Sequence, residues 1–166
     1  SILHPRVRTD YYKNTPNMPA FRGGFDGSRA PVCYNGDIFT IFDYETLCGD
    51  YPELDRVMLG RGIISNPGLL DRIAAGTNSD GSGTDKETLK RFHQMIYEGY
   101  RQIMSGDRNV LFKMKELWAC MIQIFSDNGK YIKRIKKSQR LEEYETAAAA
   151  VFRDLDILEG AGFRTY

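Results

Sequence analysis

Residues 31–70 read PVCYNGDIFTIFDYETLCGDYPELDRVMLGRGIISNPGLL, and the fold class can be argued from this segment. It holds two short apolar runs, residues 32–34 and 56–59, and each run ends in a polar turn that contains glycine. Residues 44–54, between the two turns, have apolar spacing compatible with a helix. This alternation of strand, turn and helix is typical of a parallel α/β fold.

The two turns, Asn35-Gly36-Asp37 and Gly60-Arg61-Gly62, are candidate phosphate-binding sites. Glycine allows the backbone to approach an anion closely, and the N-terminus of a following helix presents unpaired N–H groups. Arg61 adds a planar fork of donors that suits a phosphate dianion. The alternatives are an ordinary strand-to-helix turn, for which Asn-Gly is a common choice, and a surface arginine. Two such turns after consecutive strands predict the phosphate site at the last two strands of a (β/α)8 TIM barrel.

The ordered motifs of the N-terminal half resemble those of the tRNA-dihydrouridine synthases. They are ILHPRVRTDYYKNTP at residues 2–16, NGDI at 35–38 and VMLGRGIISNPGLL at 57–70. The resemblance is strong over residues 2–70 and looser from about residue 85. It implies a TIM barrel that uses FMN, followed by a helical domain that binds tRNA. The implied reaction reduces uridine in tRNA to 5,6-dihydrouridine, with NAD(P)H as the reductant.

The length of the chain conflicts with a complete barrel. The chain has 166 residues, whereas a (β/α)8 barrel needs about 250. We therefore expect the C-terminal half of a longer enzyme, inactive alone and a poor binder of FMN. Its partner would be the missing N-terminal half. Because a half-barrel exposes strand edges, a homodimer or a strand-exchanged assembly is also expected.

Composition divides the chain into α/β and all-α parts. Residues 1–75 are predicted to be the C-terminal part of the barrel, and the glycine-rich residues 76–84 a linker. Residues 85–166 show helical periodicity and predict a bundle of about four helices, the third over about residues 130–137 and the fourth over about 142–157.

Local signals predict where the helices begin. Thr84 and Glu87 have capping-box spacing, and Asp43 and Asp107 are expected as N-caps of their helices. Ser65 or Asn66 is expected to cap a short helix that has Pro67 in its first turn and runs through residue 73. The run from residue 9 to residue 28 is rich in Tyr, Asn, Pro and Gly, and it predicts a long loop with one helical turn.

The resemblance also implies which residues bind the cofactor. His4, in the HPR motif, is placed beside the flavin ring, where an imidazole can hydrogen-bond a ring carbonyl or nitrogen. The alternative is a structural histidine at the end of a strand. The predicted cofactor-binding residues are His4, Asn35, Gly36, Asp37, Gly60 and Arg61. Arg6 and Arg8 are expected either to contact tRNA phosphate or the flipped uridine, or to be surface charges.

A basic run follows in the helical part. Residues 130–140 hold six basic side chains and no acidic one. The run is either a solvated helix face or a tRNA contact, and its place in the helical module favours tRNA. Contacts of this kind supply affinity and salt dependence rather than sequence recognition. The predicted residues are Lys130, Lys133, Arg134, Lys136, Lys137 and Arg140.

No catalytic residue is assigned in this chain. The family uses a cysteine as general acid on an earlier barrel loop, and Cys33, Cys48 and Cys120 do not match its position. Their odd number and wide spacing argue against a disulfide framework or a metal site and fit a reducing cytoplasm. No apolar run reaches the roughly 20 residues that span a bilayer. The net charge of +1 favours no partner class.

Two other functions remain compatible with the sequence. One is a different FMN-dependent barrel oxidoreductase acting on a small molecule, although the basic bundle would then lack a purpose. The other is a stand-alone RNA-binding or interaction module. Flavin absorbance and salt-dependent tRNA binding would separate these possibilities.

Overall fold

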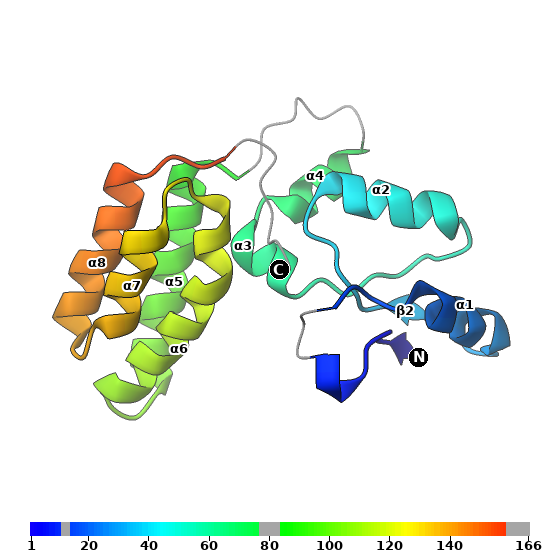
Figure 1. Ribbon diagram of the computed structural model, residues 1–166, viewed down its shortest axis with the longest axis horizontal. Helices are drawn as coiled ribbons and strands as arrows, with labels where there is room; N and C mark the ends of the chain where they lie inside the picture. The colour runs from blue at the N-terminus through cyan, green and yellow to red at the C-terminus, as the bar shows by residue number, and fades with distance from the viewer. Residues whose placement is uncertain (11–13, 77–83, 159–166) are drawn as a thin grey trace.

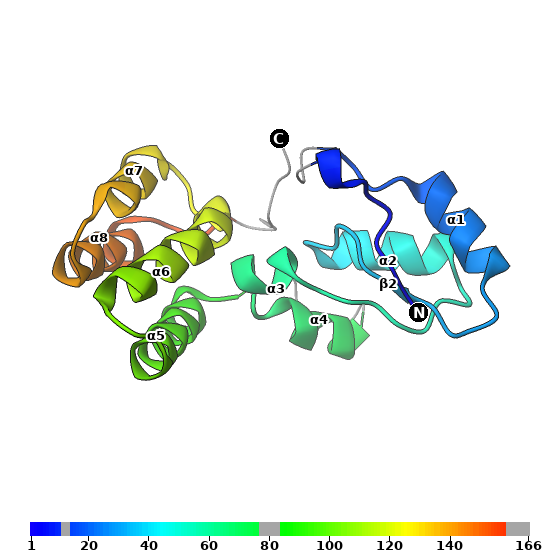
Figure 2. The same ribbon diagram turned by 90° about the horizontal axis from the view of Figure 1, so that it is seen from below.

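The structure is a computed structural model that describes residues 1–10, 14–76 and 84–158 (Figure 1). It is mostly helical, with two short parallel strands. The elements in chain order are β1 (Ile2–Leu3), η1 (Arg8–Asp10), α1 (Met18–Gly27), β2 (Cys33–Tyr34), α2 (Ile41–Asp50), α3 (Arg61–Ser65), α4 (Leu69–Ala75), α5 (Lys86–Ile103), α6 (Asp107–Met121), η3 (Ile122–Ile124), α7 (Gly129–Lys137) and α8 (Leu141–Asp154). Helices α5 to α8 lie together at one end, α1, α2 and β2 lie at the other, and α3 lies between them (Figures 1 and 2).

The strands are shorter than the sequence predicts. β1 and β2 pair in parallel, with Ile2 opposite Cys33 and Leu3 opposite Tyr34. The strand predicted at residues 56–59 is reduced to one parallel bridge between Tyr34 and Val57. These three segments still run in the same direction, so the residues that follow them come together at one edge.

Helix α1 corrects the prediction of a loop over residues 9–28. Its N-cap Asn17 accepts a hydrogen bond from the backbone N–H of Ala20 at 3.0 Å. Phe21 is almost fully buried, and its ring lies 4.9 Å from that of Tyr34 and 5.0 Å from that of Tyr51, between centroids. Three glycines lower the intrinsic helix propensity of this segment, so these tertiary contacts stabilise the helix.

Several predicted helix starts are off by one to three residues. α2 is capped by Thr40, and Asp43 is the reciprocal partner in a capping box rather than the N-cap. α5 is capped by Asp85, whose carboxylate accepts from the backbone N–H of Thr88 at 2.7 Å, so the box predicted at Thr84 and Glu87 is wrong. Asp107 is the first residue of α6 and Gly106 is its N-cap.

The bundle of α5 to α8 has its own apolar core, built around Trp118 and Tyr144. The indole N–H of Trp118 donates to the hydroxyl of Tyr144 at 2.8 Å, and Nε2 of His93 lies 2.5 Å from the same oxygen. The indole can only donate, so the Tyr144 hydroxyl accepts from Trp118 and can donate its own proton to Nε2 of a neutral His93. Burial lowers the pKa of His93 to about 4, which agrees with that state. His93 thus has a structural role in the bundle core.

Helix α3 was not predicted, and it touches both ends of the molecule. Its Ile64 packs against the bundle core, and α3 contacts α6 and η3. The other core contains Phe21, Tyr34 and Leu69 among its buried residues.

The domain boundaries stay a prediction, and residues 77–83 of the predicted linker lie outside the described part. Within the described residues, no helix combines the length and apolarity needed to cross a membrane.

Candidate functional site

The two predicted glycine turns lie side by side and are joined through Asp37. Nη2 of Arg61, the first residue of α3, lies 2.8 Å from Oδ1 of Asp37. Nη2 of Arg6 binds the other carboxylate oxygen, Oδ2. The carboxylate thereby holds two guanidinium groups from different segments at one place. We call these three residues the Arg–Asp–Arg cluster.

Two glycines permit the close approach of the turns. A Cβ atom on Gly62 would lie 2.1 Å from the carbonyl oxygen of Ile38, which is a backbone atom and cannot easily move. A Cβ on Gly36 would lie 2.0 Å from the hydroxyl oxygen of Tyr34. Any larger residue at either position would therefore separate the segments or displace the buried phenol.

Tyr34 lies beneath the first turn, and the sequence marked it only as a strand residue. Burial raises the pKa of its phenol to about 12, and the charge of Asp37 adds to the shift. The phenol is therefore neutral at physiological pH. Its contact with Gly36 was not foreseeable, because it depends on how the chain folds back at the end of β2.

The two arginines of the HPRVR segment, Arg6 and Arg8, differ in their exposure to solvent. The side chain of Arg6 is only 3% exposed, and its guanidinium also donates to the backbone carbonyl of Asn14. The alternative that Arg6 is a surface charge is therefore wrong. Arg8, in η1, is exposed, and its contact with tRNA stays a prediction.

His4 lies at the end of β1, next to the first turn. Its Nδ1 is hydrogen-bonded to the backbone carbonyl of Asn35. Because a carbonyl only accepts, Nδ1 carries the proton, and in the neutral ring Nε2 is an acceptor. A neutral His4 in this tautomer can accept from a flavin N–H, whereas donation to a flavin carbonyl requires the imidazolium. Beside His4 and Arg6 there is a cavity of about 420 Å³, bounded on its other side by Asn17 and Phe21.

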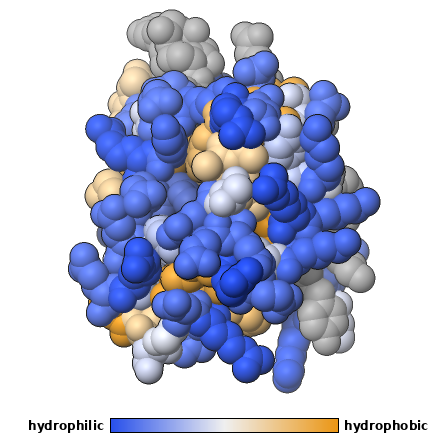
Figure 3. Space-filling view, turned by 90° about the vertical axis from the view of Figure 1, so that its left-hand side faces the viewer, coloured by the Kyte–Doolittle hydropathy of each residue, from blue (hydrophilic) through white to orange (hydrophobic). Residues whose placement is uncertain are grey.

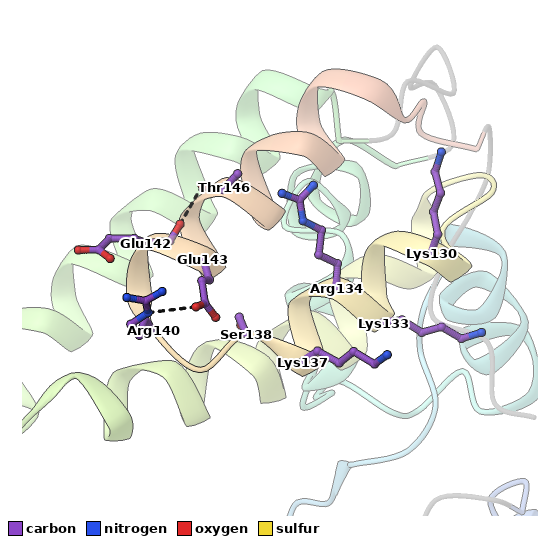
Figure 4. A pocket seen from close by; sticks show the side chains of 9 residues that line it. All are labelled: Lys130, Lys133, Arg134, Lys137, Ser138, Arg140, Glu142, Glu143 and Thr146. Atoms are coloured by element: carbon purple, nitrogen blue, oxygen red, sulfur yellow. Dashed lines mark hydrogen bonds and ion pairs between the residues drawn. The ribbon is translucent and has the colours of Figure 1, made fainter.

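A second candidate site is a groove of about 650 Å³ between α7 and the start of α8 (Figure 4). The side chains of Lys133 and Lys137 extend to the same side of α7. Arg140 is paired with Glu143, with 3.0 Å between Nε and Oε1. Five of the six predicted basic residues line this basic groove: Lys130, Lys133, Arg134, Lys137 and Arg140.

The basic residues of α7 are available to a ligand. Lys130, Lys133, Arg134, Lys136 and Lys137 are all exposed, although Lys136 does not line the groove. Among the described residues, no ion pair joins any of these five side chains to an acidic one. The surface at this end of the molecule is largely hydrophilic (Figure 3). α7 therefore presents a cluster of positive charge, and Glu142 and Glu143 of α8 line the same groove.

The chain has three cysteines, and the surroundings of Cys120 do not favour a reactive thiolate. Cys33, Cys48 and Cys120 are free and partly buried. Burial raises the pKa of the Cys120 thiol, although Arg61 opposes that shift. A raised pKa keeps the thiol protonated and a weak nucleophile.

Comparison with known proteins points to one family. The profile of the family "Dihydrouridine synthase (Dus)" matches residues 2–160. The tRNA-dihydrouridine(16) synthase of Pseudomonas putida is 28% identical over 73% of this chain and 37% of its own length. That of Neisseria meningitidis serogroup B is 23% identical over 93% of this chain and 46% of its own length. A tRNA-dihydrouridine(47) synthase [NAD(P)(+)] of Aspergillus niger is 33% identical over 48% of this chain and 10% of its own length. The chain thus spans less than half of these relatives.

Proposed function

Because this chain belongs to the dihydrouridine synthase (Dus) family, we propose that it carries the FMN phosphate site and a tRNA-binding surface of a tRNA-dihydrouridine synthase. The reaction reduces uridine in tRNA to 5,6-dihydrouridine, with NAD(P)H as the reductant. FMN, when bound, supplies the hydride chemistry that no amino-acid side chain provides. The observation that supports the proposal most directly is the meeting of two glycine turns and two guanidinium groups at Asp37.

The residues of the cluster suit a phosphate group. A guanidinium has five N–H donors, and a carboxylate partner uses only some of them. The carboxylate of Asp37 can therefore hold Arg6 and Arg61 beside the two turns, where both guanidinium groups contribute positive charge. Gly60, at the N-terminus of α3, has no side-chain cap, so the first N–H groups of α3 add to the positive field.

This arrangement revises the roles expected of Arg6 and Asp37 and specifies which ring nitrogen of His4 would be used. We assign Arg6 to the phosphate site rather than to tRNA, because its side chain is buried against Asp37. Asp37 then acts through its side chain, by orienting the arginines, in addition to its backbone. His4 would contact the flavin ring through Nε2, since Nδ1 is engaged with Asn35.

The basic groove would hold the phosphate backbone of tRNA. Lysine and arginine side chains that lack acidic partners release counterions when they bind nucleic acid, which favours binding at low salt. Such contacts orient the RNA without reading its bases. We extend this role to Lys136 and Arg8, which are exposed outside the groove.

Comparing FMN with riboflavin tests the phosphate site, because the two ligands differ only in the phosphate. The chain should bind FMN at least tenfold more tightly than riboflavin, even if both bind weakly, as measured by quenching of flavin fluorescence. Arg61→Met should remove most of this preference. Arg153→Met is the matched control, since Arg153 is an exposed residue of α8 that pairs with Asp154. Equal affinities for the two ligands in the unsubstituted chain would contradict the proposal.

A further inference from the structure

A buried hydrogen-bonded contact joins the turn between α3 and α4 to the residue that precedes α5. The hydroxyl of Thr84 donates to Oδ1 of Asn66 and accepts from the backbone N–H of Gly68 at 2.6 Å. The backbone N–H of Thr84 also donates to Oδ1 of Asn66 at 3.3 Å. We call this contact the Asn66–Thr84 clasp.

The hydrogen bonds of the clasp restrict how Asn66, Gly68 and Thr84 can lie relative to one another. Asn66 is 5% exposed and Thr84 is 7% exposed, so both residues are shielded from water while the contact is closed. Buried polar groups without partners are costly, and hydrogen bonds are directional. A Cβ on Gly68 would lie 2.7 Å from the Thr84 hydroxyl, so a side chain at position 68 would force the contact open.

The clasp lies where the two ends of the molecule meet. α3 begins at Arg61, which binds Asp37, and its Ile64 packs against the bundle core. Asn66 follows α3 directly, and Thr84 leads into the longest helix of the bundle. α3 lies between the bundle and the strands in both ribbon views (Figures 1 and 2). α3 and the clasp thus connect the Arg–Asp–Arg cluster to the helices that carry the basic groove.

We propose that Asn66 and Thr84 are positioning residues that fix the orientation of the bundle relative to the two phosphate-binding turns. The inference rests on the proposed function, since it explains how a tRNA held at α7 is aligned with the flavin site. Neither residue needs to touch the cofactor or the RNA. Their role is to restrict the molecule to the orientation in which both sites can be used together.

Residual dipolar couplings of the 166-residue chain test the inference without any ligand. In the unsubstituted chain, helices α1 and α2 and helices α5 to α8 should fit one alignment tensor. Thr84→Val, which keeps the shape and removes the hydroxyl, should give different tensors for the two groups. Thr84→Ser should restore a single tensor. Thr46→Val is the matched control, because Thr46 lies on an exposed position of α2.

A second variant and a fluorescence measurement show whether a change in the tensors comes from the clasp or from misfolding of the chain. Asn66→Ala removes the amide oxygen that accepts from the Thr84 hydroxyl, and it should also give different tensors for the two groups of helices. The fluorescence of Trp118, in the bundle core, should stay as in the unsubstituted chain for every variant. A single tensor in both Thr84→Val and Asn66→Ala, with Trp118 unchanged, would overturn the inference.

Binding of tRNA gives the functional readout. If the competent orientation falls to about a tenth of the population, the apparent affinity of Thr84→Val for tRNA falls about tenfold. Thr84→Ser should bind as tightly as the unsubstituted chain. Unchanged affinity in Thr84→Val would contradict the link to tRNA. If the unsubstituted chain bound no tRNA, the proposed function would fail, and the tensors would still decide whether the clasp fixes the orientation.

Discussion

At the residue scale, Gly62 decides whether the two glycine turns can meet. Its missing Cβ makes room for the carbonyl of Ile38. Gly62→Ala should lower the free energy of unfolding by about 1–3 kcal/mol, since the clash is with backbone rather than with a flexible side chain. It should also reduce the preference for FMN over riboflavin. Urea unfolding and flavin titration measure the two effects.

Gly99→Ala is the control for Gly62→Ala, because here the added methyl group should increase stability rather than lower it. Gly99 lies inside α5, and no atom outside its own helix would come within 4 Å of an added Cβ. Alanine is the better helix former, so this substitution should raise the free energy of unfolding by about 0.5–1 kcal/mol. A loss of stability in Gly99→Ala comparable to that of Gly62→Ala would show that close packing of the turns is not the cause.

His93 makes the stability of the bundle depend on pH. Its pKa is about 4 in the fold because of burial, against an ordinary value of 6.5. Between these values the unfolded chain binds a proton that the folded chain does not. The free energy of unfolding therefore has its full value, as far as His93 determines it, above pH 6.5. It decreases by roughly 3 kcal/mol as the pH falls towards 4. Urea unfolding at about pH 7 and about pH 4.5, on either side of the ordinary pKa, should show this loss in Trp118 fluorescence.

His93→Gln tests the assignment of that pH dependence. Glutamine can still accept from the Tyr144 hydroxyl but does not titrate. The variant should be less stable than the unsubstituted chain at neutral pH and should lose much less stability on acidification. If both proteins lost the same amount over this pH range, another group would be responsible.

At the element scale, α7 should determine how tRNA binding responds to salt. Removing one phosphate-binding charge lowers the slope of log affinity against log salt concentration by about one. Replacing Lys133 and Lys137 together with glutamine should therefore reduce the slope by about two. Lys113→Gln is the control, because Lys113 lies on α6 and is paired with Glu116 at 2.8 Å. An unchanged slope in the double variant would place tRNA elsewhere.

Elements with a strong local signal could be predicted from the sequence, and those that depend on distant contacts could not. The spacing of Val110, Met114 and Trp118 predicts α6, and all three are buried as expected. α1 was missed because its stabilising partners, Tyr34 and Tyr51, lie far along the chain.

At the scale of the whole molecule, the sequence predicted that the two glycine turns lie close together but not how they are joined. Two glycine turns after parallel segments implied a shared site, and the contact between Arg61 and Asp37 agrees with that. The buried position of Arg6 and the clasp at Thr84 depend on how separate segments pack. No local pattern distinguishes a buried threonine from one in a polar linker.

The two apolar cores should unfold at different urea concentrations. The core around Phe21 has seven buried residues, whereas that of the bundle has eighteen. Because stability grows with the apolar area removed from water, the smaller core should unfold first. The circular dichroism signal should begin to fall before the fluorescence of Trp118, the one tryptophan of the chain. Phe21→Ala should move the first transition to lower urea and leave the second in place, since Phe21 packs against Tyr34 and Tyr51 in the smaller core. Coincident curves that both shift in Phe21→Ala would mean instead that α3 and the clasp couple the two cores into one cooperative unit.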